Sequence, residues 1–241
     1  MKTFSITDTG IIRETNQDYL FASEKSVGNL PNLFIVADGM GGHRAGDYAS
    51  RHTVERIVAS ITRTKEEKPI SILKEAIDKA NELLVAESKR DETKSGMGTT
   101  LVIASIFDNT MYVANVGDSR LYICGQSIRQ ITRDHSLVNE MILMGEISEE
   151  EAKNHPDKNV ITRAIGVKEH VEADYFEVEL TNDELVLLCT DGLTNMVSDE
   201  EIQKILVNDE ILENKAEKLI KRANKNGGSD NITVMIINPF S

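Results

Sequence analysis

The amino-acid sequence predicts an α+β fold in which antiparallel sheets pack face to face and helices cover them on the outside. Three observations support this class. Short apolar runs of strand length occur along the whole chain of 241 residues, and most follow one another as hairpins. Amphipathic helices are inserted between groups of these strands. No Pro-, Gly- or Ser-rich linker divides the sequence, so residues 1–241 are expected to form a single domain.

The N-terminal elements are defined by hydrophobic periodicity. Residues 2–8 and 18–24 alternate as strands do, and residues 33–37 form a continuous apolar run that is typical of a buried strand. Apolar residues then recur at helical spacing over residues 45–62 and again over residues 72–84. This part of the chain is therefore expected to contribute three strands and two helices.

The later strands are predicted from apolar runs and turn residues. These runs lie at residues 99–107, 110–117, 119–124, 171–180, 185–190 and 232–237. Asp108 and Asn109 separate the first two runs and predict a hairpin turn, because both residues tolerate the left-handed backbone that such turns need.

The later helices are predicted from periodicity and capping signals. Residues 135–154 are expected to be helical and strongly polar in their second half, and a further helix covers about residues 212–225. Two capping boxes mark helix starts, Ser148-x-x-Glu151 and Ser198-x-x-Glu201.

Composition excludes several classes of function. The formal net charge is −13 and the pI is near 4.9, which argues against general affinity for nucleic acid or anionic membranes. The N-terminal residues lack the apolar core of a signal peptide. No run approaches the roughly 20 apolar residues of a membrane helix. We therefore expect a cytoplasmic protein that neither binds nucleic acid nor inserts into a membrane.

The two cysteines are expected to be buried core residues. Cys124 and Cys189 are far apart in the sequence and each has apolar, strand-like neighbours. Two reduced thiols in the cytosol fit this pattern better than a disulfide, and no Cys-x-x-Cys metal motif is present.

Four aspartates at the ends of apolar runs are the strongest functional signal. Asp38, Asp118 and Asp191 follow such runs, and Asp230 precedes one. Carboxylates gathered at the rims of central strands would repel one another unless cations lay between them. A single Asp-Gly pair most often marks a turn, but the joint pattern predicts a cluster of bound divalent metal ions.

The residue types favour Mn²⁺ or Mg²⁺ in this cluster. Aspartate oxygens are hard ligands, and the five histidines show no spacing that would recruit a softer metal. Gly39 follows Asp38 and is the best candidate for a backbone carbonyl ligand. Arg13 is suited to bind phosphate oxygens, although a lone arginine in a polar turn is most often simply solvated, and Asp18 could equally form a turn.

Seven motifs occur in the order found in metal-dependent Ser/Thr protein phosphatases of the PPM, or 2C-type, family, and the sequence resembles the bacterial members most closely. The resemblance extends from about residue 3 to residue 238. The motifs are Arg13…Asn16-Gln-Asp18, Val36-Ala-Asp38-Gly-Met-Gly-Gly-His43, Gly98-Thr-Thr100, Ala114-Asn-Val-Gly-Asp118-Ser-Arg120, Asp134-His-Ser136, Thr190-Asp-Gly-Leu193 and Ser229-Asp-Asn-Ile-Thr233.

The resemblance implies a fold and a set of metal ligands. The family fold is a β-sandwich of two antiparallel sheets flanked by helices, a four-layer α-β-β-α arrangement. By resemblance, Asp38 bridges two ions, the Gly39 carbonyl binds one of them, and Asp191 and Asp230 bind the other.

Three further roles follow from the resemblance. Asp118 would join Asp191 at a third, more weakly bound ion. Asp18 would accept a hydrogen bond from a water on an ion rather than bind the ion directly. Arg13 would grip the substrate phosphate. Gly98-Thr-Thr100 and Asp134-His-Ser136 are expected to be structural.

One position departs from the animal relatives, which have a histidine assigned as general acid directly after the Asp-Gly pair. Here that position is Met40, as is common in bacterial members, and a thioether cannot donate a proton. His43 lies three residues further on and is expected to be a turn or helix-start residue. Protonation of the leaving group is then expected from a water on the metal ions.

The implied function is hydrolysis of phosphoserine or phosphothreonine on proteins by a metal-activated water, with release of phosphate. Such an enzyme would be a monomeric signalling hydrolase that opposes a bacterial membrane Ser/Thr kinase. Residues 137–164 would form a mobile flap that gates substrate, or else an ordinary surface helix and loop. Two other classes fit the sequence less well: a phosphoprotein-binding scaffold with an idle site, and a calcium-stabilised structural domain. The first predicts gaps among the acidic ligands, and the second predicts a compact ligand-dense loop; the sequence has neither.

Overall fold

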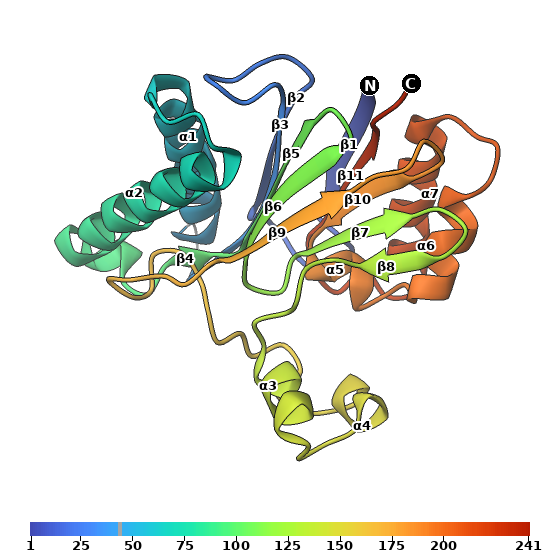
Figure 1. Cartoon of the computed structure of the whole chain (residues 1–241). Helices are drawn as coiled ribbons and strands as arrows, with labels where there is room; N and C mark the ends of the chain where they lie inside the picture. Colours follow the sequence, from blue (N-terminus) through green and yellow to red (C-terminus); the bar gives the residue numbers. More distant parts are fainter. Residues whose placement is uncertain (43–44) are drawn as a thin grey trace.

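The computed structural model describes residues 1–42 and 45–241. Two antiparallel sheets lie face to face, with helices on both outer surfaces (Figure 1). This is the four-layer arrangement that the sequence predicts. None of the helices in the described part of the chain is long and apolar enough to cross a bilayer.

The first sheet combines the two ends of the sequence with its middle. Its strand order is β1-β11-β10-β7-β8, and all its pairs are antiparallel. The strands are β1 (Lys2–Asp8), β7 (Arg120–Cys124), β8 (Ile128–Gln130), β10 (Leu185–Cys189) and β11 (Ile232–Asn238). Because β11 lies between β1 and β10, the last strand of the chain is a central strand of this sheet.

The second sheet has the order β2-β3-β5-β6-β9, and the short β4 pairs with the end of β3. Its strands are β2 (Asp18–Ser23), β3 (Leu33–Met40), β4 (Gly98–Thr99), β5 (Leu101–Phe107), β6 (Thr110–Val116) and β9 (Asp174–Glu179). Asp108 adopts a positive φ of 51° in the two-residue turn between β5 and β6, as its position in the sequence predicts.

Helices cover the two sheets separately. Helices α1 (Ala45–Arg63) and α2 (Pro69–Arg90) pack on the second sheet, and a 3₁₀ turn, η1 (Glu92–Lys94), follows α2. Helices α5 (Asp191–Thr194), α6 (Asp199–Leu206) and α7 (Leu212–Lys225) pack on the first sheet. Figure 1 shows the two helical layers on opposite sides of the sandwich.

Strand alternation builds three separate cores. In β3, Leu33 and Ile35 face α1 and α2, whereas Phe34 and Val36 face the other sheet. All four side chains are fully buried. A strand that is covered on both faces has no polar side, so it appears in the sequence as a continuous apolar run rather than as an alternating one.

Helices α3 (Leu137–Met144) and α4 (Glu149–Lys153) form a separate projection, which we call the flap (residues 137–164). It extends away from the two sheets, as Figure 1 shows in yellow-green and yellow. The single helix predicted over residues 135–154 is wrong in one respect: it breaks at Gly145, which has a φ of +73° that ends α3. The capping box at Ser148 and Glu151 is present at the start of α4.

Candidate metal centre

The functional side chains gather where strands of both sheets end. Asp18 on β2 is directly opposite Asp38 on β3 in the strand register. Its Oδ2 also accepts hydrogen bonds from the hydroxyls of Thr190, at 2.9 Å, and Thr233, at 2.6 Å, which belong to the other sheet. The carboxylate of Asp18 therefore joins the two sheets at this end of the sandwich.

The backbone of Asp38 is held by two threonines. The Thr100 hydroxyl accepts the Asp38 N–H at 2.9 Å, and the Thr99 hydroxyl donates to the Asp38 carbonyl at 2.8 Å. The Thr100 N–H donates to the same carbonyl at 2.9 Å. These bonds fix the direction in which the Asp38 side chain leaves the strand.

Gly39 has no room for a side chain. A Cβ at this position would lie 2.0 Å from the Gly46 carbonyl oxygen and 2.6 Å from that of Gln17. The Gly39 N–H donates to the Gln17 carbonyl at 3.1 Å. Because α1 approaches the end of β3 this closely, only glycine fits at position 39.

Burial, followed by mutual repulsion, raises the pKa values of these carboxyl groups. Burial, followed by repulsion from Asp18, Asp191, Asp118 and Asp230, raises the pKa of Asp38 well above its usual value. Burial is also the main reason why the pKa values of Asp18, Asp118 and Asp191 rise to about 7, 8 and 6. The folded protein gathers charges that repel one another unless protons or cations neutralise them.

These residues fit divalent cations. The Oδ1 atoms of Asp18 and Asp191 are buried without a hydrogen-bond partner, so each has an oxygen free for a cation or for water on one. Within residues 1–42 and 45–241, no three His, Cys, Asp or Glu side chains converge on one ready-made ion position. Mg²⁺-like ions require only one or two carboxylates, because they keep several waters.

Arg13 lies at the edge of this cluster. Its Nη2 donates to Asp230 Oδ2 at 2.7 Å, and about half of its side chain is exposed. The same Asp230 carboxylate accepts the Asn231 N–H at 2.8 Å through Oδ1. An exposed guanidinium beside the carboxylate cluster is available to a phosphate that approaches from solvent.

Asp118 follows a constrained turn at the end of β6. Gly117 has a φ of +99°, and a Cβ there would lie 2.7 Å from the Thr100 side chain. Nearby, Arg120 forms a fork of hydrogen bonds with Asp134, at 2.7 to 3.0 Å. Asp118 itself lies near enough to Asp38 and Asp191 for the negative charges of these carboxylates to repel one another.

Comparison with known proteins identifies this arrangement. The family model described as Protein phosphatase 2C matches residues 6–141. The chain is 44% identical over 236 residues to the serine/threonine phosphatase stp of Listeria monocytogenes serotype 4b, covering 96% of this chain and 93% of that protein. The chain belongs to the protein phosphatase 2C family.

Solved structures agree with this membership. Serine/threonine phosphatase Stp1 from Staphylococcus aureus superposes with a TM-score of 0.91 at 34% identity, covering 98% of this chain and 93% of that one. The catalytic domain of the phosphatase PstP, in complex with two manganese ions, superposes with a TM-score of 0.85 at 31% identity, covering 98% and 96%. The present chain is accordingly a protein serine/threonine phosphatase that depends on divalent metal and acts on phosphorylated proteins. The predicted sandwich fold is confirmed.

Sequence reasoning missed the residues that orient this phosphatase's aspartates. Thr99 and Thr100 have a structural role, as expected, but the sequence did not indicate that this role is to hold the Asp38 backbone. Thr190 and Thr233 belong to two of the sequence motifs, and the hydroxyls of both donate to Asp18. The sequence signal that could have identified these threonines is a hydroxyl residue at the end of an otherwise apolar strand.

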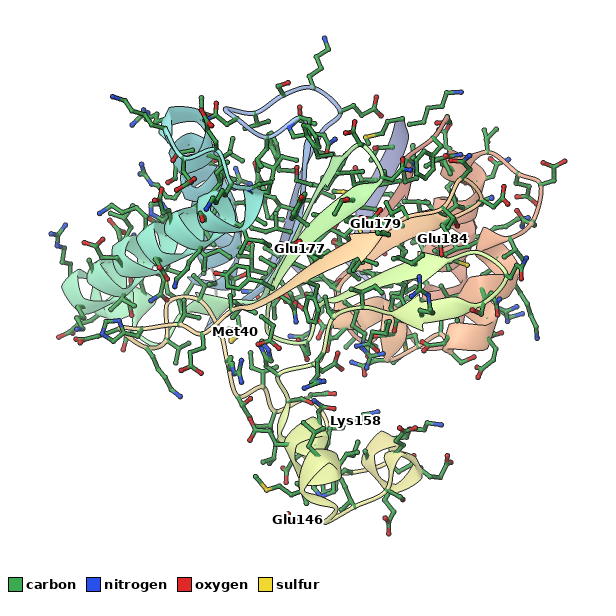
Figure 2. All side chains as sticks on the ribbon, in the orientation of Figure 1. Met40, Glu146, Lys158, Glu177, Glu179 and Glu184 are labelled. Carbon is green, nitrogen blue, oxygen red and sulfur yellow. The ribbon has the colours of Figure 1, made fainter. Side chains whose placement is uncertain are left out.

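Two positions near the Asp-Gly pair bear on the proton source. Met40 pairs with Gly98 at the end of β3, and Figure 2 shows its side chain at the base of the flap. A thioether at this position carries no transferable proton. His43, which the sequence assigned to a turn or helix start, lies outside the described residues.

Proposed function

We propose that this phosphatase holds two core dications, Mn²⁺ or Mg²⁺, through Asp38, the Gly39 carbonyl, Asp191 and Asp230, and a third, weaker ion through Asp118 with Asp191. One observation carries the proposal: carboxylates from both sheets are buried close together, and burial, with repulsion between neighbouring carboxylates second, raises the pKa values of Asp18, Asp38, Asp118 and Asp191. Such a cluster is stable only when positive charge is added.

When bound, the dications act as Lewis acids and activate a solvent water as nucleophile. The protein's own side chains orient that water and bind the phosphate. Asp18 is clamped through Oδ2 by two threonine hydroxyls, and its free Oδ1 accepts a hydrogen bond from water at the centre and orients it. To orient a water, the Asp18 carboxylate must itself have a fixed orientation, and the two threonine hydroxyls provide it.

Arg13 binds the phosphate of the substrate. The guanidinium exchanges Asp230 for two phosphoryl oxygens, because bidentate contacts to phosphate are a favoured geometry for arginine. There it neutralises charge on the phosphoryl group as the bond to the serine or threonine oxygen breaks. With Met40 unable to act, the leaving alkoxide takes its proton from solvent.

The cysteines do not form a covalent intermediate. Cys124 and Cys189 are both buried, and burial raises the pKa of the Cys124 thiol to about 11 and that of Cys189 even further. A thiol that stays protonated is a poor nucleophile. A phosphocysteine intermediate is therefore not expected, in agreement with the proposed direct attack of water on the phosphate.

The biological setting follows by analogy with the family. Residues 1–241 act as one catalytic domain and as a monomer in the cytoplasm, where the enzyme opposes a membrane-bound Ser/Thr kinase and dephosphorylates that kinase and its targets. The flap gates access of these protein substrates to the metal centre.

Counting bound ions tests the ligand assignment. Isothermal calorimetry with Mn²⁺ on the EDTA-stripped enzyme should resolve two tight sites and one weaker site. Asp118→Asn should remove only the weak site, whereas Asp38→Asn should disrupt both tight ones. Asp183→Asn, in the exposed turn before β10, is the matched control and should bind like wild type. Two tight sites that survive in Asp38→Asn would refute the assignment.

A further inference from the structure

The flap joins the body through two short feet, which we define as residues 134–136 and 161–165. The feet are linked to each other by an isolated bridge between Ser136 and Ile161. The Thr162 N–H also donates to the His135 carbonyl at 2.8 Å. Movement of the flap must therefore pass through these paired feet to reach the body.

His135 in the first foot is bonded on both sides to the turn that carries Asp118. Its backbone N–H donates to the Gly117 carbonyl at 3.0 Å, and its ring Nδ1 accepts the Gly117 N–H at 3.1 Å. Both polar groups of the Gly117 backbone are thus satisfied by one residue. His135 is only 5% exposed, so water does not compete for these bonds.

The opposite side of the ring faces the flap's second foot. Because Nδ1 is an acceptor, the ring proton lies on Nε2, which is 3.2 Å from Asp174 Oδ2. Asp174 Oδ1 in turn accepts from Arg163 Nη1 at 3.1 Å. The imidazole therefore connects Gly117 on one side with an ion pair from the flap and β9 on the other.

The second foot reaches the other side of the metal centre. Ile165 and Thr99 exchange backbone hydrogen bonds at 2.9 and 3.1 Å, and the Thr99 hydroxyl bonds the Asp38 carbonyl. That contact is made by backbone and is therefore insensitive to side-chain type. The contact of the first foot with the Asp118 turn is also made partly by backbone, but the bond that satisfies the Gly117 N–H comes from one side chain, that of His135.

We propose that His135 is a positioning residue through which the flap sets the Asp118 turn and thereby the affinity of the weakest metal site. This rests on the proposed role of Asp118. The flap exposes Leu143 and Met144 to solvent, at 62% and 71%, so a protein substrate has an apolar surface by which to move it. A substrate that shifts the flap then alters the Asp118 turn through the imidazole.

Two substitutions separate this role from simple packing. His135→Asn keeps an oxygen acceptor near the position of Nδ1 but loses most of the ring. His135→Phe keeps a ring of similar size but has no acceptor for the Gly117 N–H. If the acceptor matters, Asn should substitute for histidine and Phe should not; if only packing matters, the order is reversed.

The first measurement is calorimetric titration of each variant with Mn²⁺. His135→Phe should weaken Mn²⁺ binding at the third, weakest site by about 10-fold or more, as is typical when a residue that orients a metal ligand is lost. Binding at the two tight sites should be unchanged. His135→Asn should stay within about 3-fold of wild type. The control is His155→Phe, because His155 Nδ1 also accepts a backbone N–H, that of Asp157, but within the flap itself.

The second measurement is amide hydrogen exchange in residues 137–160 as the third site fills. Mn²⁺ should slow exchange there in wild type and in His135→Asn, but not in His135→Phe. The proposal would be overturned if His135→Phe bound the third Mn²⁺ as strongly as wild type does, or if His135→Asn weakened this binding as much as His135→Phe does. If the wild-type enzyme showed no third Mn²⁺ site at all, the proposed role of Asp118 would fail, and the role of His135 with it.

Discussion

The rim of the sandwich that holds the aspartates and the flap beside it are built in opposite ways. At the rim, Thr190 and Thr233 are fully buried and Asp18 is 6% exposed, and hydrogen bonds from both sheets fix the carboxylate. In the flap, α3 buries only Val138 within its own length and exposes Leu143 and Met144. Many hydrogen bonds fix the rim, whereas the flap contacts the body mainly through its feet in the part of the chain that the structure describes.

This contrast agrees with the proposed division between a rigid metal centre and a flap that gates protein substrates. Groups that hold metal ions and phosphate must keep their geometry to within a fraction of an ångström, so they belong on packed strands. A region that meets many different phosphoproteins gains from local mobility, because few buried contacts resist its movement. Substitutions in the two regions should therefore differ in size and in kind.

The largest effect is expected from the rim. Asp38→Asn or Asp191→Asn should lower kcat on both p-nitrophenyl phosphate and a phosphothreonine peptide by more than about 100-fold, because each removes a proposed ligand of the core ions. Phosphate release in the presence of Mn²⁺ measures this. Chelation by EDTA should abolish the wild-type activity, and Mn²⁺ or Mg²⁺ should restore it. Unchanged turnover in either variant would contradict the assignment.

Arg13 should produce the next largest effect. Arg13→Ala should reduce kcat/KM by about 10- to 100-fold for both substrates, since one charged contact to the phosphoryl group is lost. Arg129→Ala is the matched control, because Arg129 is as exposed as Arg13, at 51%, and also pairs with a carboxylate, that of Glu184. If the two alanine variants behave alike, Arg13 is only a surface residue.

The flap should affect one class of substrate selectively. Replacing residues 137–160 with a short Gly-Ser linker should reduce kcat/KM for a phosphoprotein by about 10-fold, with less than about a 3-fold change for p-nitrophenyl phosphate. A small ester needs no gate, whereas a protein must dock beside the metal centre. Equal losses on both substrates would show that the segment supports the fold rather than substrate choice.

The smallest effect is thermodynamic and concerns the metal-free protein. The raised pKa values of Asp18 and Asp191, about 7 and 6 against 3.8, mean that the folded state binds their protons more tightly than the unfolded state. Stability is therefore lost as pH rises from about 4 to about 7. The Tm of the EDTA-stripped enzyme should fall by about 10 °C or more across this window, and saturating Mn²⁺ should reverse the loss at neutral pH. A Tm independent of pH would indicate that the carboxylates are well solvated.

Much of the fold could be predicted because strands buried on both faces leave long apolar runs. The two sheets, the hairpin at Asp108 and the long helices all follow from periodicity and turn residues. The strand β8 was missed because it has only three residues, none of them buried. The short helix α5 was missed because four residues carry too little periodicity.

The acidic residues of the site could be predicted, but their supports could not. Asp38, Asp118, Asp191 and Asp230 stand out because charge is rare beside buried strands. The bonds from Thr190 and Thr233 to Asp18 span 172 and 215 residues of sequence, so no local pattern records them. The ion pair of Arg13 with Asp230, 217 residues apart, is hidden for the same reason.

The central position of β11 has a consequence for the timing of activity during synthesis. The strand pairs with β1 from Lys2 opposite Asn238 to Asp8 opposite Ile232, and Asp230 lies just before it. A ribosome must translate through β11 before the first sheet can close and the last acidic side chain can join the cluster. A nascent or prematurely terminated chain that lacks β11 is therefore expected to be inert toward phosphoproteins, and dephosphorylation should begin only once β11 has paired with β1.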